Sequence, residues 1–158
     1  MSEVMTKESP QDQLAIGLLL GGRVRCVIAD TSASVRAAQK AHNLDPLATM
    51  AMGRALAGVA LMASQLKDKD LFVHCSFSGS GVMGKVVAEG NGGGGLRGYV
   101  MIPQLAPFFK DKETVPQTVG GALGESGQLT VVYGRYGVRD QHMAVSDFAD
   151  GEIGSDIA

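Results

Sequence analysis

The stretch that begins at Gly79 reads GSGVMGKV, and its residue types and spacing come nearest to a known chemistry. Gly79, Gly81 and Gly84 fit the spacing of a dinucleotide-binding loop, and Lys85 completes most of a P-loop pattern. Both motifs hold phosphate only where the glycine loop opens a helix, because the N–H groups at the helix N-terminus bind the phosphate. A nucleotide-binding enzyme that uses the Gly79–Lys85 loop is therefore the alternative function that the sequence leaves open.

The residues after this loop favour a strand over a helix. Lys85 leads into Val86 and Val87, which are adjacent β-branched residues, and a glycine cluster begins at Gly90. Val86 also occupies the position at which a P-loop carries Ser or Thr for magnesium. We therefore expect a hairpin turn whose glycines permit positive φ.

The cysteines and histidines form no recognisable catalytic or metal-binding pattern. Cys26 and Cys75 each lie in an apolar, strand-like run, and a disulfide framework or a zinc site would need more thiols at closer spacing. His74 adjoins Cys75, but neighbours on a strand point to opposite faces. No G-x-S-x-G nucleophile elbow is present, so His42, His74 and His142 are expected to be capping, surface or core residues. We predict no catalytic, cofactor-binding or metal-binding residue in this chain.

The longest apolar segment runs from Pro46 to Leu66 and carries a single charge, Arg54. A helix that is apolar or small on all sides is buried in protein or spans a membrane. The length fits a bilayer, but a central arginine costs about 2.5–3.5 kcal/mol there, and alanine and glycine offset little of that. We expect a buried core helix with Asp45 as its N-cap and Pro46 at its first position. A buried Arg54 then needs an ion pair or a carbonyl to cap.

Alternating apolar residues predict strands on both sides of this helix. The predicted strands are residues 23–29, 71–77, 85–88, 96–102, 128–133 and 141–145. A short helix over 35–42 is expected to end at Asn43 in a left-handed conformation, and residues 103–117 are expected to form an irregular loop. The order predicts an α+β fold, a layered β/α/β domain with mostly antiparallel strands around a buried central helix, 46–66.

The composition argues against several classes of function. The chain of 158 residues has 14 basic and 16 acidic residues, with no basic stripe for nucleic acid and no polybasic block for a membrane surface. The apolar run 14–20 is short and follows acidic residues, unlike a secretory signal. We expect residues 1–12 to be a disordered tail and residues 13–158 to be one domain of a cytoplasmic protein.

An ordered series of short matches along the chain resembles the thirty-three-kilodalton heat-shock protein family, the redox-regulated holdase chaperones of bacteria. The matching residues are Val24-Arg25, Asp30-Thr31, Val35, His42-Asn43-Leu44, Pro46, Gly53-Arg54, Leu56, Leu61-Met62, Gly81, Gly84, Arg97-Gly98-Tyr99-Val100, Pro103, Val119-Gly120, Gly124, Leu129-Thr130-Val131-Val132, Gly151-Glu152-Ile153 and Asp156-Ile157-Ala158. The resemblance covers nearly everything after the tail, so residues 13–158 resemble the N-terminal domain of that family.

The resemblance implies a chaperone rather than an enzyme. It implies that the chain binds unfolding client proteins, prevents their aggregation without ATP, and forms a homodimer. In this family a C-terminal module holds zinc with a Cys-x-Cys and a Cys-x-x-Cys pair, and oxidation to the disulfide bond form releases the zinc and exposes apolar surface. Neither pair occurs here, so we expect a truncated domain without the module and no zinc ligand at Cys26 or Cys75. The client-binding residues remain unassigned by the sequence.

Overall fold

The computed structural model describes residues 11–109 and 114–158 of the chain. In chain order its elements are β1 (Gln13–Leu19), the 3-10 turn η1 (Leu20–Gly22), β2 (Val24–Asp30), α1 (Ser32–His42), α2 (Pro46–Ala63), β3 (Leu71–Gly79), β4 (Lys85–Asn91), β5 (Leu96–Val100), the 3-10 turn η2 (Ala106–Phe108), α3 (Val119–Leu123), β6 (Gly127–Arg135), β7 (His142–Asp147) and α4 (Gly154–Ile157). The first ten residues of the predicted tail, 1–12, lie outside the described residues, as do residues 110–113 of the predicted loop.

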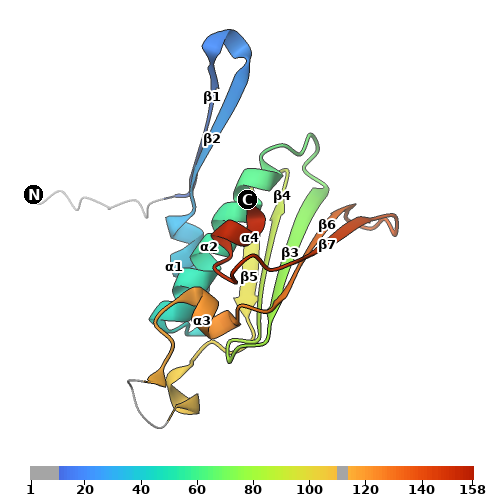
Figure 1. Cartoon of the computed structure of the whole chain (residues 1–158). Coiled ribbons are helices and arrows are strands. Elements are labelled where there is room, and N and C mark those ends of the chain that lie inside the picture. The colour runs from blue at the N-terminus through green and yellow to red at the C-terminus, as the bar shows by residue number, and fades with distance from the viewer. Residues whose placement is uncertain (1–10, 110–113) are drawn as a thin grey trace, which may run out of the picture.

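Five strands form the main antiparallel sheet, in the order β5-β4-β3-β6-β7 (Figure 1). The predicted alternation holds in its central strand, because Val73, Cys75 and Phe77 are all fully buried in the core. The two residues between them, His74 and Ser76, are only partly buried and lie on the opposite face of the sheet. The alternation therefore decides which face of the sheet builds the core.

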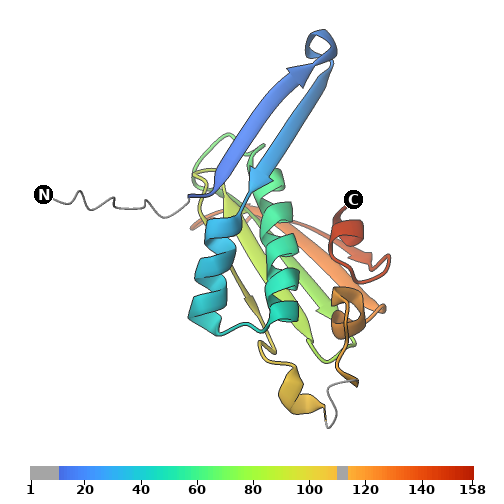
Figure 2. The ribbon, with the colours of Figure 1, turned by 90° about the vertical axis from the view of Figure 1, so that its left-hand side faces the viewer.

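The long helix α2 covers one face of this sheet and lies mainly over β4, with further contacts to β3 and β5 (Figure 2). Its start is as predicted: the Asp45 side chain accepts a hydrogen bond from the Ala48 N–H at 2.8 Å, and Pro46 is the first helical residue. The helix ends at Ala63 rather than at Leu66. The cap and the proline thus set the position of this helix from local chemistry alone.

The burial of α2 is strongest on the side that faces the sheet. Ala48, Ala55 and Val59 are fully buried, whereas Met50 and Leu61 on the other side are 47% and 38% exposed. By length and composition α2 also passes as a candidate membrane span, a test that the core helices of soluble proteins pass too. Its packing on the sheet agrees with the prediction of a core helix.

The helix α1 lies beside α2 (Figure 2), and its two ends are held in different ways. At its start, Asp12 Oδ1 accepts hydrogen bonds from the N–H groups of Ala33 at 2.8 Å and Ser34 at 3.1 Å. At its end, Asn43 adopts the predicted left-handed conformation, with φ 50° and ψ 51°. The assignment of Asp12 to a disordered tail is therefore wrong, because this residue caps a helix of the folded domain.

The strands β1 and β2 form a separate antiparallel hairpin that projects from the rest of the molecule (Figures 1 and 2). The sequence predicted β2 as residues 23–29 but did not predict β1, whose run 14–20 is apolar throughout and shows no alternation. The Arg25 guanidinium donates to the Ser64 carbonyl at 3.3 Å, so β2 is tied to the C-terminal end of α2.

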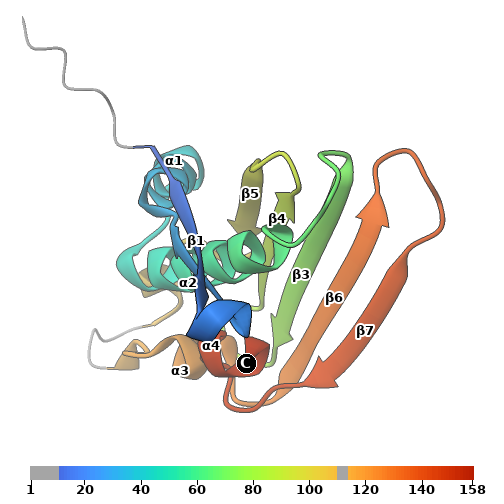
Figure 3. The same ribbon diagram turned by 90° about the horizontal axis from the view of Figure 1, so that it is seen from above.

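These layers confirm the predicted α+β fold class with antiparallel strands. A central helix packs on a five-stranded sheet, and the second sheet is the two-stranded hairpin. Viewed from above, β6 and β7 extend away from the helices (Figure 3). The short helices α3 and α4 contact α2 on the side of the molecule away from α1.

Candidate functional site

The glycine-rich loop after β3 is a docking site for the backbone of α3. The Gly81 N–H donates to the Leu123 carbonyl at 2.7 Å, and the Met83 N–H donates to the Ala122 carbonyl at 2.8 Å. These N–H groups, which a phosphate would need, are therefore already occupied. Lys85 begins a strand, as expected from the residues that follow it, and not a helix. The geometry does not favour the nucleotide-binding alternative at Gly79–Lys85.

The two cysteines are free thiols that lie in different sheets. Cys75 is fully buried in β3, and burial raises the pKa of its thiol to about 12, so the thiol stays protonated at neutral pH. Cys26 is partly buried on β2. Within residues 11–109 and 114–158, no group of three or more His, Cys, Asp or Glu residues is placed to hold a metal ion. Cys26 and Cys75 therefore do not fit a zinc site, which needs thiolates close together.

Glu89 lies at the centre of a polar cluster on the sheet face opposite α2. Its Oε1 accepts hydrogen bonds from Arg97 Nε at 2.9 Å and from the Tyr136 hydroxyl at 2.8 Å. His74 Nδ1 lies 3.3 Å from its other carboxylate oxygen, while His42 and His142 are exposed elsewhere. The Tyr136 ring stacks on Phe72 with the ring centroids 5.0 Å apart. This cluster joins three strands and the turn after β6 on one face of the sheet.

The environment of Glu89 predicts a loss of stability in acid. Burial is the largest single influence on the Glu89 carboxyl, and it raises the pKa. The hydrogen bonds from Tyr136 and Arg97, together with the charge of Arg97, lower the pKa by more than burial raises it. The pKa of Glu89 therefore lies below its ordinary value of 4.5. A carboxyl with a lowered pKa stabilises the fold above its unfolded pKa, and this contribution is lost as the pH falls through the folded pKa. We expect Glu89→Gln to lower the urea midpoint at neutral pH, and its difference from the wild type to shrink below pH 4.5. A difference that stays constant from neutral to strongly acidic pH would contradict this role.

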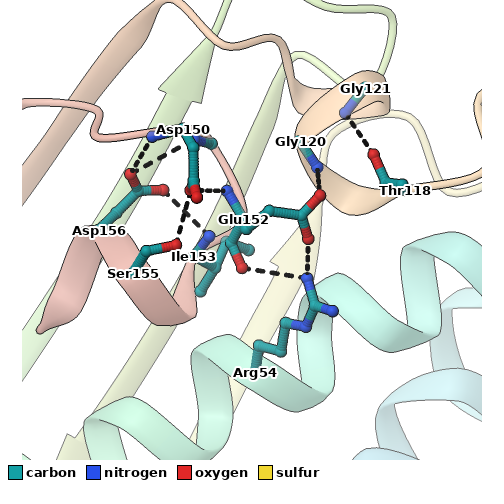
Figure 4. Close-up of polar contacts among 10 residues, drawn as sticks. Arg54, Thr118, Gly120, Gly121, Asp150, Glu152, Ile153, Ser155 and Asp156 are labelled. Atoms are coloured by element: carbon teal, nitrogen blue, oxygen red, sulfur yellow. Dashed lines mark hydrogen bonds and ion pairs between the residues drawn. The ribbon is translucent and has the colours of Figure 1, made fainter.

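Arg54 connects α2 to the segment before α4 (Figure 4). Its guanidinium pairs with the Glu152 carboxylate and also donates to the Glu152 carbonyl at 3.1 Å. The other oxygen of the carboxylate accepts the Gly120 N–H of α3 at 2.9 Å. Both forms of the predicted role of Arg54, an ion pair and a carbonyl cap, are therefore confirmed. The pair joins three segments that lie far apart in the sequence.

The Asp156 carboxylate binds the backbone of the segment between β7 and α4 (Figure 4). Its Oδ1 accepts the N–H groups of Ala149, Asp150 and Gly151 at 2.7, 3.2 and 3.3 Å, and its Oδ2 accepts that of Ile153 at 3.0 Å. Ile153 has φ 64°, which is unfavourable for a branched residue, and its side chain is fully buried. The acidic side chains of this segment thus hold its backbone in place.

The contribution of the Arg54–Glu152 pair is measurable by a double-mutant cycle. We expect Arg54→Met and Glu152→Gln, alone and together, to reveal a coupling energy of about 1 kcal/mol in urea unfolding, since the two side chains are 38% and 30% exposed and solvent screens part of their attraction. Glu152→Gln retains an oxygen for the Gly120 N–H, so the cycle isolates the ion pair. Additive effects of the two substitutions would show that the pair contributes nothing to stability.

The hairpin carries a large apolar surface that the rest of the described structure leaves open. The exposed large hydrophobic side chains on it are Leu14, Ile16, Leu18, Leu19, Leu20, Val24 and Ile28. Because side chains alternate between the faces of a hairpin, both of its faces are apolar. Exposed apolar surface of this extent marks an interaction site in a soluble domain. We therefore take the hairpin, residues 13–30, as the candidate functional surface.

A cavity of about 300 Å³ continues this surface at the base of the hairpin. Leu14 lines it from β1, Ala60 and Ala63 from α2, and Leu96 from β5, while Asn91 at the end of β4 adds a polar side chain. The cavity therefore extends the apolar surface of the hairpin toward the main sheet.

Sequence reasoning did not locate this surface, although a signal was present. The apolar run 14–20 is followed by Gly21 and Gly22 and then by the alternating run 23–29. Two strand-like runs on either side of a glycine pair are typical of a hairpin. The first run lacks the alternation that marks strands with one buried face, so alternation alone does not identify it as a strand.

Comparison with known proteins extends over almost the whole chain. The family model described as Hsp33 protein matches residues 12–158. The chain belongs to the Hsp33 family. Among its Hsp33 relatives, the 33 kDa chaperonin of Bacillus licheniformis is 34% identical over 146 residues, which is 92% of this chain and 49% of that protein. The 33 kDa chaperonin of Desulfotalea psychrophila is 31% identical over 159 residues, 100% of this chain and 49% of that protein.

The fold agrees with a solved Hsp33 structure. The crystal structure of the 33 kDa chaperonin (heat shock protein 33 homolog) of Thermotoga maritima matches with a TM-score of 0.79 and 31% sequence identity, over 92% of this chain and 48% of that chain. The chain thus spans about half the length of the Hsp33 relatives that it matches. The resemblance predicted from the sequence motifs is confirmed, and the names of the relatives support a chaperone.

Proposed function

We propose that this chain is a holdase domain that binds unfolding proteins and keeps them from aggregating, without ATP and without catalysis. The open apolar hairpin carries the proposal. Unfolding proteins expose apolar segments of many different sequences, and burial of apolar area is favourable by about 25 cal/mol per Å² whatever the sequence. A two-sided apolar surface such as residues 13–30 suits this kind of binding better than a shaped pocket would.

We further propose a homodimer in the cytoplasm, with no nucleic-acid or membrane partner. A two-stranded hairpin is marginally stable by itself in water, which supports a second copy or a client as its cover. Sedimentation equilibrium tests the dimer, and a mass of 16.4 kDa at every protein concentration would contradict it. We propose that these residues act without a cofactor, and that zinc and redox regulation belong to the family's cysteine module rather than to Cys26 and Cys75.

The holdase proposal predicts suppressed light scattering from a heat-unfolding client enzyme. We expect the chain to reduce the scattering in reducing buffer, without an oxidant, because the hairpin surface is already open. Scattering that is equal with and without the chain would overturn the proposed function.

Matched variants assign the activity to the hairpin. Leu18→Ser and Ile28→Ser remove side chains that are 67% and 66% exposed, so we expect little loss of stability but a clear loss of suppression. Phe108→Ser removes a side chain that is 61% exposed but lies outside the hairpin, and it should leave suppression unchanged. Equal losses in all three variants would contradict a specific role for the hairpin.

A further inference from the structure

We infer that β7 is a binding site for extended polypeptide, where an apolar segment of an unfolding protein adds to the open edge as a further antiparallel strand. The inference rests on the proposed function, because it names where and how the client backbone is bound. Figure 3 shows β7 at the end of the main sheet, on the side away from α1 and α2.

The two outer strands of the main sheet differ in how they are covered. β5 contacts both α1 and α2, whereas β7 packs mainly against β6 within the part of the chain that the structure describes. All six residues of β7 are exposed. Its sequence, HMAVSD, contains no proline or lysine, two residues that natural proteins use to block open strand edges, and its one acidic residue, Asp147, is the last of the strand. β7 is therefore an unprotected template for strand pairing.

The register of β6 and β7 shows which backbone groups face the sheet. The Phe148 N–H donates to the Gly127 carbonyl at 2.9 Å, so these two residues form a hydrogen-bonded pair just beyond the paired ends of the strands. Hydrogen-bonded and non-hydrogen-bonded pairs alternate along an antiparallel ladder. Every second residue back from Phe148, including Ser146 and Ala144, therefore bonds to β6.

The intervening residues, Met143, Val145 and Asp147, turn their N–H and C=O groups toward the open edge. Met143 and Val145 also place their side chains on the sheet face opposite α2, where they are 69% and 51% exposed. An added strand would gain main-chain hydrogen bonds, which do not depend on its sequence, and apolar contacts at alternate side chains. This combination suits the capture of many different unfolding chains.

The open edge of β7 is already formed before a client binds. β7 belongs to a five-stranded sheet in which β3 and β4 contribute buried residues to the core, whereas the hairpin has only two strands. A preorganised edge loses less conformational freedom when a strand adds to it. For this reason we assign capture of the client backbone to β7 rather than to the edges of the hairpin.

Amide hydrogen exchange, followed residue by residue on the intact chain, tests the inference. The probe is a peptide of about ten alternating valine and threonine residues, long enough to pair with a strand of ordinary length, with lysines at both ends. At saturating peptide we expect exchange at Met143, Val145 and Asp147 to slow by at least about tenfold, while Ala144 and Ser146, already bonded to β6, change little. Equal slowing at all five amides, or no slowing at the first three, would overturn the inference. Protection of the first three that grows with protein concentration in the absence of peptide would assign the edge to a second copy and would overturn it as well.

Two variants of one residue separate the main chain from the side chain. Val145→Pro removes an N–H that faces the open edge and leaves the bonds to β6 in place, whereas Val145→Thr keeps both the N–H and the branched shape. In fluorescence anisotropy we expect Val145→Pro to weaken peptide binding by at least about tenfold and Val145→Thr by less than about threefold. A peptide with N-methyl groups on alternate residues should bind to the wild-type protein as weakly as the unmodified peptide binds to Val145→Pro. Equal binding of the unmodified peptide to Val145→Pro and to the wild type overturns strand addition.

Light scattering separates this inference from the proposed function. If the wild type suppresses client aggregation and Val145→Pro suppresses it equally, the inference fails and the proposed function stands. If the wild type does not suppress aggregation, the proposed function fails, and the exchange pattern at Met143, Val145 and Asp147 still decides whether β7 binds an extended chain.

Discussion

Gly79→Ala is expected to lower the free energy of unfolding by about 3 kcal/mol or more. A Cβ atom on Gly79 would lie 1.9 Å from the Leu123 carbonyl oxygen and 2.8 Å from its carbonyl carbon. Both atoms belong to the backbone of α3, so no side-chain rotation relieves the clash. The helix must move away, and its hydrogen bonds to the Gly81 and Met83 N–H groups must lengthen or break.

Urea unfolding followed by circular dichroism measures this effect, and Gly154→Ala is the matched control. No atom lies within 4 Å of a Cβ built on Gly154. We therefore expect the free energy of unfolding of Gly154→Ala to differ from that of the wild type by less than about 0.5 kcal/mol. Equal stability of the two variants would show that α3 does not dock on the loop. A nucleotide-binding loop predicts the opposite pattern, in which Gly79→Ala loses nucleotide binding and keeps its stability.

Ala55→Leu is expected to cost about 1–3 kcal/mol of stability, because it overpacks the core. Ala55 is fully buried on the side of α2 that faces the core, and a leucine there must displace neighbouring side chains or the helix itself. Alanine and leucine both favour helices, so a loss of this size reports packing and not helix propensity.

The melting temperature of Ala55→Leu, compared with that of Ala57→Leu, measures this cost. Ala57 is only partly buried in the same helix, and a leucine there should change stability by less than about 0.5 kcal/mol. An unchanged melting temperature for Ala55→Leu would contradict the packing of α2 on the sheet. Gly58→Leu, which also tests the small residues of α2, acts elsewhere: a Cβ at Gly58 would lie 2.3 Å from Ile157 Cδ1, so this variant must move the Ile157 side chain of α4.

Several parts of the candidate functional surface could have been predicted more fully from the sequence. The Gly21-Gly22 pair between two apolar runs indicates a hairpin, but nothing in the runs says whether another layer covers it. The exposure of Leu18 and Ile28 is a property of the assembled fold. The edge position of β7 is likewise a property of the assembled fold. The sequence predicts a strand there but does not predict where that strand lies in the sheet order.

The sequence by itself determined the features that depend on interactions between near neighbours. The alternation of Val73, Cys75 and Phe77, the Asp45 cap with Pro46, and the left-handed Asn43 are all local, and all were predicted. The strand after Lys85, which argued against a phosphate loop, was readable in the same way from adjacent β-branched residues.

Only the tertiary structure decided the features that join distant segments. The glycine loop receives the backbone at Ala122 and Leu123, and Arg54 finds Glu152 at a separation of 98 residues. The cap of α1 comes from Asp12, a residue that the sequence assigned to a tail. Local patterns cannot specify such pairs, because each partner is presented by an element whose position depends on the packing of the whole core. The same limit hid the open hairpin and the open edge of β7, the two surfaces on which the proposed function depends.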